Sequence, residues 1–102
     1  MKLKDMQETL EHELQDPEYA AMYLNDALHD GSPEEFLLAL KNIIRATQGM
    51  SQVASQTELG RESLYKAFSE SGNPHFLTVH KVISALGFQF AIAPASEGEP
   101  PA

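Results

Sequence analysis

Residues 50–68, MSQVASQTELGRESLYKAF, decide how the fold of this chain is interpreted. Two short helical patterns, residues 50–57 and 61–70, flank residues 58–60, a stretch too short for anything but a tight turn. Apolar side chains on both pieces would pack the two helices against each other: Val53, Ala54, Leu59, Leu64 and Phe68. The stretch therefore predicts a helix-turn-helix.

Three more helices are predicted ahead of this stretch. The second of them begins after Asp16, whose side chain can cap the first turn, and ends at Gly31. The third, residues 33–48, begins with a capping box formed by the sequence SPEE at residues 32–35. The first, residues 3–15, is polar apart from a narrow apolar stripe that needs a surface to lie on: Leu3, Met6, Leu10 and Leu14.

The chain after the helix-turn-helix predicts one helix, residues 76–86, and one strand. The sequence FQFAIA at residues 88–93 alternates, which places Phe88, Phe90 and Ile92 on one side of a strand, against the helices. A single strand in a helical chain leaves backbone groups unpaired. It therefore needs an edge, either the same strand of a second copy or a sheet in another protein.

Charge divides the chain into unlike parts. The net charge is −8, which by itself argues against binding to nucleic acid, because phosphate contacts supply most of that affinity. Residues 1–35, however, hold ten acids against two lysines. Residues 36–93 are mildly basic, with Lys41, Arg45, Arg61, Lys66 and Lys81 against Glu58, Glu62 and Glu70. This asymmetry favours two surfaces with different partners, the alternative being that the acidic part is only a solvated face.

Several classes of protein are excluded by composition. The 102 residues fit one domain with a modest core, and they contain no apolar run near the ~20 residues of a membrane span. The N-terminus carries acids where a signal peptide would be apolar, and cysteine is absent, so the expected location is the cytoplasm.

No enzymatic or metal site is expected. The four histidines, His12, His29, His75 and His80, show no i, i+4 pair on one helix of the kind that zinc motifs use. The sequence has no nucleophile elbow and no glycine-rich phosphate loop. We therefore expect neither catalysis nor a cofactor.

The sequence GMSQVASQTELGRESLYKAFSESGNPHFLTVHKVISALGF, residues 49–88, resembles the helix-turn-helix of the Cro/repressor (XRE) family. More narrowly, residues 16–93 are similar to HigA-like addiction-module antidote proteins, and RESLY followed by GNP is the most specific part. The resemblance implies an all-α fold, a five-helix bundle of lambda-repressor-like DNA-binding type. To this the sequence adds an N-terminal helical extension and one short C-terminal β-strand.

The resemblance also implies a function and a division of the chain. The protein would be the antitoxin of a type II toxin–antitoxin module, a homodimer that represses its own operon and neutralises a RelE/ParE-like toxin. Residues 1–31 would form the acidic helical extension, residues 32–93 the DNA-binding domain with its strand, and residues 94–102 a disordered tail. Two alternatives stay open: a stand-alone or phage-type XRE regulator without a toxin, and an interaction protein that has lost DNA binding.

Two departures from the family pattern affect the helix-turn-helix. The family has Gly-Leu-Ser ahead of the recognition helix, whereas this chain has Glu58, Leu59 and Gly60. A glutamate at a position that needs a positive φ costs about 1 kcal/mol, and Gly60 caps a helix less well than serine. The family also favours Thr-Gln at the start of the preceding helix, where this chain has Gly49 and Met50.

The residues expected to contact DNA lie on and beside the recognition helix. Arg61 suits guanine, Glu62 suits a cytosine amine, and Lys66 suits a base or a phosphate. The alternative for these charges is solvation, with Glu62 and Lys66 forming an i, i+4 ion pair. Tyr65 would contact the sugar-phosphate backbone, and Asn73 and His75 lie in the following loop, near phosphate in related folds. The full expected set is Ser51, Gln52, Arg61, Glu62, Ser63, Tyr65, Lys66, Asn73 and His75.

Overall fold

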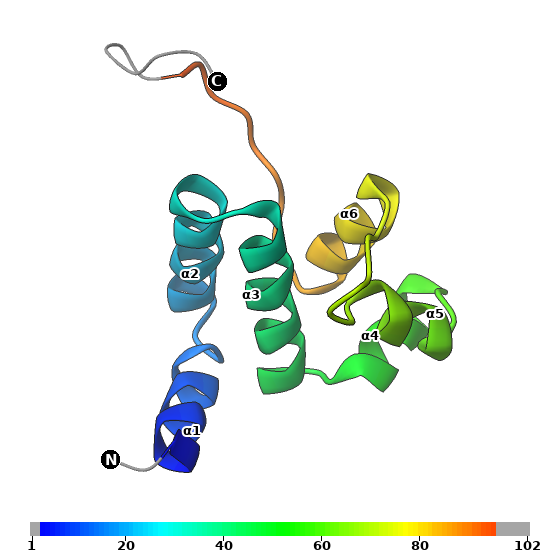
Figure 1. Ribbon diagram of the computed structural model, residues 1–102, viewed down its shortest axis with the longest axis horizontal. Coiled ribbons are helices and arrows are strands. Elements are labelled where there is room, and N and C mark those ends of the chain that lie inside the picture. The colour runs from blue at the N-terminus through cyan, green and yellow to red at the C-terminus, as the bar shows by residue number, and fades with distance from the viewer. Residues whose placement is uncertain (1–2, 96–102) are drawn as a thin grey trace.

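The computed structural model describes residues 3–95 of the chain, and this part is helical (Figure 1). Its elements are α1 (Leu3–Glu13), α2 (Pro17–Asp30), α3 (Pro33–Ala46), α4 (Met50–Thr57), α5 (Arg61–Ala67) and α6 (Phe76–Ala85). The all-α class is confirmed, and every helical segment expected from the sequence is present. The largest difference is at α5, which ends at Ala67 instead of continuing to Glu70.

Two helix starts follow from local capping. The Asp16 side chain accepts a hydrogen bond of 3.1 Å from the backbone N–H of Glu18, and Pro17 opens α2. The Ser32 hydroxyl accepts one of 3.2 Å from the N–H of Glu35 at the start of α3. The Asp16 cap is as the sequence predicts, whereas of the capping box predicted at residues 32–35 only the half made by the Ser32 hydroxyl is present.

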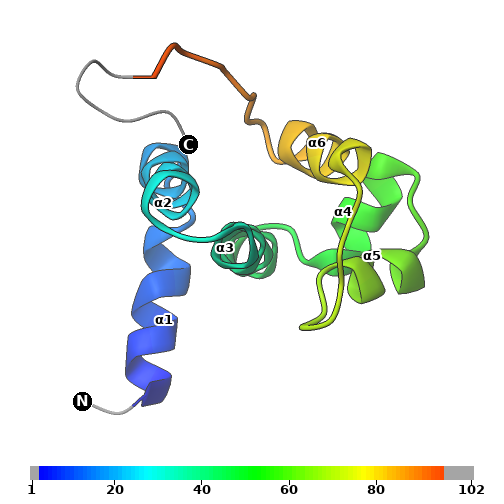
Figure 2. The same ribbon diagram turned by 45° about the horizontal axis from the view of Figure 1, so that its top comes forward.

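Helix α3 lies at the centre of the molecule. Helices α1 and α2 cover one side of it, and α4, α5 and α6 lie on the other (Figures 1 and 2). Its buried side chains therefore face two groups of helices: Phe36, Ala39, Leu40, Ile43, Ile44 and Ala46. A single hydrophobic cluster runs from Leu14 at the end of α1 to Ile83 in α6.

Polar side chains tie the two sides to the end of α3. Gln15, between α1 and α2, donates a hydrogen bond of 3.3 Å to the carbonyl of Ala46. Gln48 donates one of the same length to the carbonyl of Ala85 at the end of α6. The α1–α2 loop and the α3–α4 loop are thus each held by a side chain that donates to a helix-end carbonyl.

The apolar stripe of α1 is only partly used as a packing surface. Leu14 is almost fully buried, Leu10 packs at the edge of the core, and Met6 stays exposed. The C-terminal half of α1 therefore belongs to the core, and a deletion of residues 1–15 would open it.

The predicted C-terminal strand is wrong for the described residues. The chain after α6 runs in an extended path along the helices and then beyond them (Figure 1), but residues 88–95 are not part of any sheet. Phe88 and Phe90 turn toward the helices as the alternation predicts, whereas Ile92 is 100% exposed. A strand requires a hydrogen-bonding neighbour, and the described part of the chain supplies none.

Other expectations stay untested. Residues 96–102, most of the predicted disordered tail, lie outside the described residues. The domain limits at residues 31 and 93 remain predictions. Between residues 3 and 95 there is no helix long and apolar enough to cross a membrane.

Candidate functional site

The three-residue turn between α4 and α5 has the backbone that the sequence predicts. Glu58 has φ 60° and ψ 17°, a left-handed conformation, and is the one non-glycine residue of the described chain with a positive φ. Thr57 shapes the turn from the buried side. Its hydroxyl donates to the carbonyl of Val53 at 2.7 Å and accepts from the N–H of Leu59 at 3.4 Å. The turn therefore keeps its form despite a residue that prefers other angles.

Replacing Glu58 by glycine is expected to stabilise the protein by about 0.5–1 kcal/mol. Glycine adopts a left-handed backbone without the steric penalty, although its unfolded state gains some entropy. Urea denaturation followed by circular dichroism measures the change. Glu58→Ala is the control, because it removes the carboxylate but keeps the Cβ. An alanine variant as stable as the glycine variant would show that the side-chain charge, and not the backbone, is responsible.

The N-termini of α4 and α5 lack side-chain caps. Gly49 precedes α4 and Gly60 precedes α5, and neither can offer a capping oxygen. The first-turn N–H groups of both helices therefore have no side-chain acceptor from the capping position, and such groups attract anions. Ser51 and Gln52, in the first turn of α4, are exposed and therefore accessible to a ligand.

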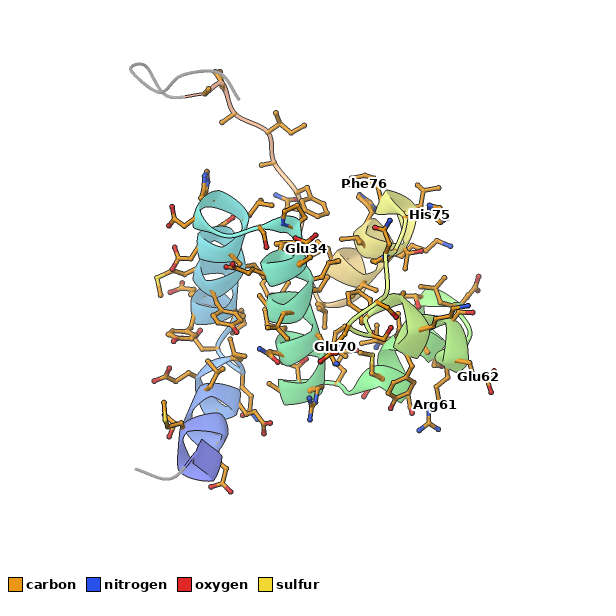
Figure 3. All side chains as sticks on the ribbon, in the orientation of Figure 1. Glu34, Arg61, Glu62, Glu70, His75 and Phe76 are labelled. Atoms are coloured by element: carbon orange, nitrogen blue, oxygen red, sulfur yellow. The ribbon has the colours of Figure 1, made fainter. Side chains whose placement is uncertain are left out.

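The outer face of α5 carries most of the expected site. Arg61 and Glu62 project into solvent from the start of the helix (Figure 3), and Ser63 and Lys66 are also exposed. The Arg61 guanidinium carbon lies 5.5 Å from the centroid of the Tyr65 ring, one turn along the same helix. This cation–π contact holds the guanidinium over a ring that is 48% exposed.

Of the alternative account, solvation fits the exposure of these side chains, whereas the expected ion pair is absent from the described residues. Within residues 3–95, Glu62 and Lys66 make no ion pair, although they are one turn apart on α5. Lys66 therefore keeps its charge available to an external group. The Arg61–Tyr65 contact was missed by sequence reasoning, although an Arg and a Tyr at i, i+4 are a recognisable signal.

Asn73 and His75 occupy a different place. Both are exposed, and His75 directly precedes α6 without capping it through its side chain. Figure 3 shows His75 at the end of the α4–α6 group far from Arg61 and Glu62. The structure thus groups the α5 side chains and separates His75 from them. In the same loop, Gly72 is needed for space, because a Cβ there would collide with the carbonyl oxygens of Lys66 and Ala67.

Comparison with known proteins identifies the family. Residues 4–94 match the model of a family described as "Probable addiction module antidote protein". The chain belongs to this family. A protein of Haemophilus influenzae (strain ATCC 51907 / DSM 11121 / KW20 / Rd), described as "Uncharacterized protein", is 45% identical over 91 residues, which are 89% of this chain and 91% of that relative. No solved structure matches the chain.

An addiction module antidote has a toxin as its counterpart, and α1 and α2 present a further exposed surface. The outer side of α1 and α2 has two exposed methionines, Met6 and Met22. It also has seven exposed carboxylates: Glu8, Glu11, Glu13, Asp16, Glu18, Asp26 and Asp30. Tyr19 and Tyr23 lie at the border of this side and pack against the core. Tyr23 accepts a hydrogen bond of 3.0 Å from the Asn42 amide. The hydrogen bond between Tyr19 and the Glu13 carboxylate raises the pKa of the Tyr19 hydroxyl.

Proposed function

We propose that this antidote is an antitoxin that also binds its operator DNA and represses its own operon. Supporting this is the exposed face of α5, where Arg61, Ser63 and Lys66 stand on a short helix that follows α4 after a three-residue turn. A recognition helix reads the major groove with side chains of this kind near its N-terminus. The resemblance to HigA-like XRE proteins and to the lambda-repressor type of bundle supports the same assignment.

The expected DNA-contacting residues other than Ser63, which only lines the same exposed helix, each have a separate role in the proposal. Arg61 reads guanine, Glu62 accepts from a cytosine amine, and Lys66 reaches a base or a phosphate. Tyr65 contacts the sugar-phosphate backbone while it supports Arg61. Ser51 and Gln52 contact phosphate beside the open N-terminus of α4. Asn73 and His75 are proposed only as outlying phosphate contacts, because His75 lies far from Arg61.

The distribution of charge supports the separation of two partners. The acids of α1 and α2 would repel DNA phosphates, and α5 belongs to the mildly basic part of the chain. The DNA-facing side is thus α4–α5, and the toxin-facing side is α1–α2. In the proposal the protein acts as a homodimer, because one α5 offers too few base contacts for specific binding. It acts in the cytoplasm, without catalysis and without a cofactor.

The DNA part of the proposal is tested by footprinting on the region upstream of the gene. Two protected half-sites about 34 Å apart are expected, since two-fold dimers place their recognition helices one helical turn apart. A protein that binds this DNA no better than a scrambled sequence would be an interaction protein without operator recognition.

The toxin that we propose as the partner is a basic RelE/ParE-like protein. A protein that acts on RNA is basic, and an acidic surface with exposed methionines offers it both charge complementarity and adaptable apolar contact. The test partner is a small basic protein encoded next to this gene, and its presence there is itself the first check of the proposal.

Reversing two charges on α2, by Glu18→Lys with Asp26→Lys, is expected to slow association with this toxin about tenfold at low salt and less at high salt. Biolayer interferometry at two salt concentrations measures the rate. The matched control, Glu58→Lys with Glu70→Lys, changes the net charge equally at exposed sites in the α4–α5 half. Equal slowing by both pairs would mean that net charge, and not the α2 surface, governs the encounter.

A further inference from the structure

The segment after α6 is fixed against the helices on one side and open on the other. The Phe90 ring lies 6.4 Å from that of Phe36 in α3, 5.7 Å from that of Phe76 and 6.2 Å from that of His80 in α6, between ring centroids. Phe88 also packs against the core. The side chains between and beyond them are exposed, and Ile92 is 100% exposed. The segment is therefore an anchored extended chain with a free edge.

The backbone of this segment lacks partners within the described chain. The N–H of Phe88 donates to the carbonyl of Ile83 at 3.0 Å, which is the last backbone hydrogen bond before residue 95. An extended chain held in place with unpaired N–H and C=O groups is a template for another strand. Its sequence allows a ladder of about five residues, which ends at Pro94 because proline has no N–H to donate.

The distribution of charge along the chain indicates which molecule supplies the pairing strand. Residues 82–96 contain no charged side chain and no histidine, whereas the whole chain has a net charge of −8. Two copies repel each other wherever their acidic residues 1–35 approach, and this neutral segment is a place where they can meet without bringing like charges together. A strongly basic partner, by contrast, is drawn to the acids of α1 and α2 and not to a neutral edge.

We propose that residues 88–93 pair antiparallel with the same residues of a second copy. In a two-fold pair the same faces of both strands coincide, so Ile92 lies beside Phe88 or Phe90 of the second copy. The pairing therefore covers the most exposed large apolar side chain of the described residues and satisfies the free backbone groups. It supplies the interface of the dimer that the proposed function needs, but it does not depend on DNA binding.

Sedimentation of the full chain without DNA tests the pairing. Gln89 and Ala91 are exposed on the outer face. In a two-fold register centred on residue 90 they face each other across the ribbon, and in one centred on residue 91 each Ala91 faces Ala91 of the second copy with Gln89 as a diagonal neighbour. The pair Gln89→Glu with Ala91→Glu, and the pair Gln89→Lys with Ala91→Lys, should each weaken the dimer about tenfold. An equal mixture of the two should restore the parent affinity, because opposite charges then face each other. Matched controls add the same charges to α4, by Ser55→Glu with Gln56→Glu and by Ser55→Lys with Gln56→Lys.

Three outcomes would overturn the proposal. The first is a parent protein that sediments as a monomer at all concentrations. In the second, charged variants at residues 89 and 91 dimerise as tightly as the α4 controls, which places the dimer contact elsewhere. The third is a mixture of the Glu and Lys variants that dimerises no better than either alone. Loss of DNA binding with an intact dimer would instead count against the operator role and leave the pairing standing.

Discussion

Replacing Arg61 and Lys66 together by alanine should weaken operator binding by about 2–6 kcal/mol while the fold and any toxin binding are retained. Each lost base contact costs about 1–3 kcal/mol, and both side chains are exposed, so their removal leaves the core unchanged. The Arg61 contact is expected to carry much of the loss, because Tyr65 already holds its guanidinium in place. A gel-shift titration at fixed salt measures the effect.

The control for this variant removes the same charges from elsewhere. Arg45 in α3 and Lys81 in α6 are both exposed, so Arg45→Ala with Lys81→Ala again removes one arginine and one lysine. This pair should lower affinity for operator and scrambled DNA alike, as the loss of non-specific phosphate attraction does. If the α5 variant behaved in the same way, α5 would contribute only charge and would not read sequence.

Leu40→Ala is expected to destabilise the protein by about 2–5 kcal/mol, a large part of the total for a domain of this size. Leu40 is 0% exposed in the helix that contacts both groups of helices, so the cavity would affect both. Leu38→Ala, two residues earlier on the same helix and 56% exposed, should change stability by less than about 0.5 kcal/mol. Urea denaturation of the three proteins gives the comparison.

The same experiment tests whether the two sides of α3 unfold together. Tyr19 and Tyr23 lie in α2 and Tyr65 lies in α5, so a Tyr65→Phe background confines tyrosine fluorescence to the N-terminal side. Coincident transitions by fluorescence and by circular dichroism are expected for one cooperative unit. Separate transitions would instead make residues 1–31 a distinct extension, the division that the sequence predicts.

Local signals made the helices predictable. Asp16 and Ser32 cap the turns directly after them, and the periodic apolar positions of α3 are buried as expected. The left-handed backbone of Glu58 was predictable from the family resemblance, because related proteins have glycine at this position of the turn. The absence of a strand at residues 88–93 was not predictable, because a strand depends on a hydrogen-bonding neighbour and the described chain has none. The alternation did correctly predict that Phe88 and Phe90 pack against the helices.

The candidate site was predictable in composition but not in arrangement. Helical spacing alone places Arg61 one turn from Tyr65 and Glu62 one turn from Lys66, and all four side chains are exposed. The distance of His75 from Arg61 and Glu62 depends instead on the path of the loop through Gly72, whose close approach to the α5 carbonyls is a tertiary contact. Closeness in sequence to α5 was therefore a poor guide to closeness in space.

The order of the helices along the chain also affects how quickly the protein folds. Its substantial helix contacts join elements that are neighbours or next neighbours along the chain: α1 with α3, α2 with α3, α3 with α4, α4 with α5, and α4 with α6. Helical domains with contacts this local have low contact order and fold in microseconds to milliseconds. The contact of Phe90 with Phe36 joins residues much farther apart in the sequence, and it is made by a segment near the end of the chain. The helices can thus assemble as synthesis proceeds, and the extended edge is added after them.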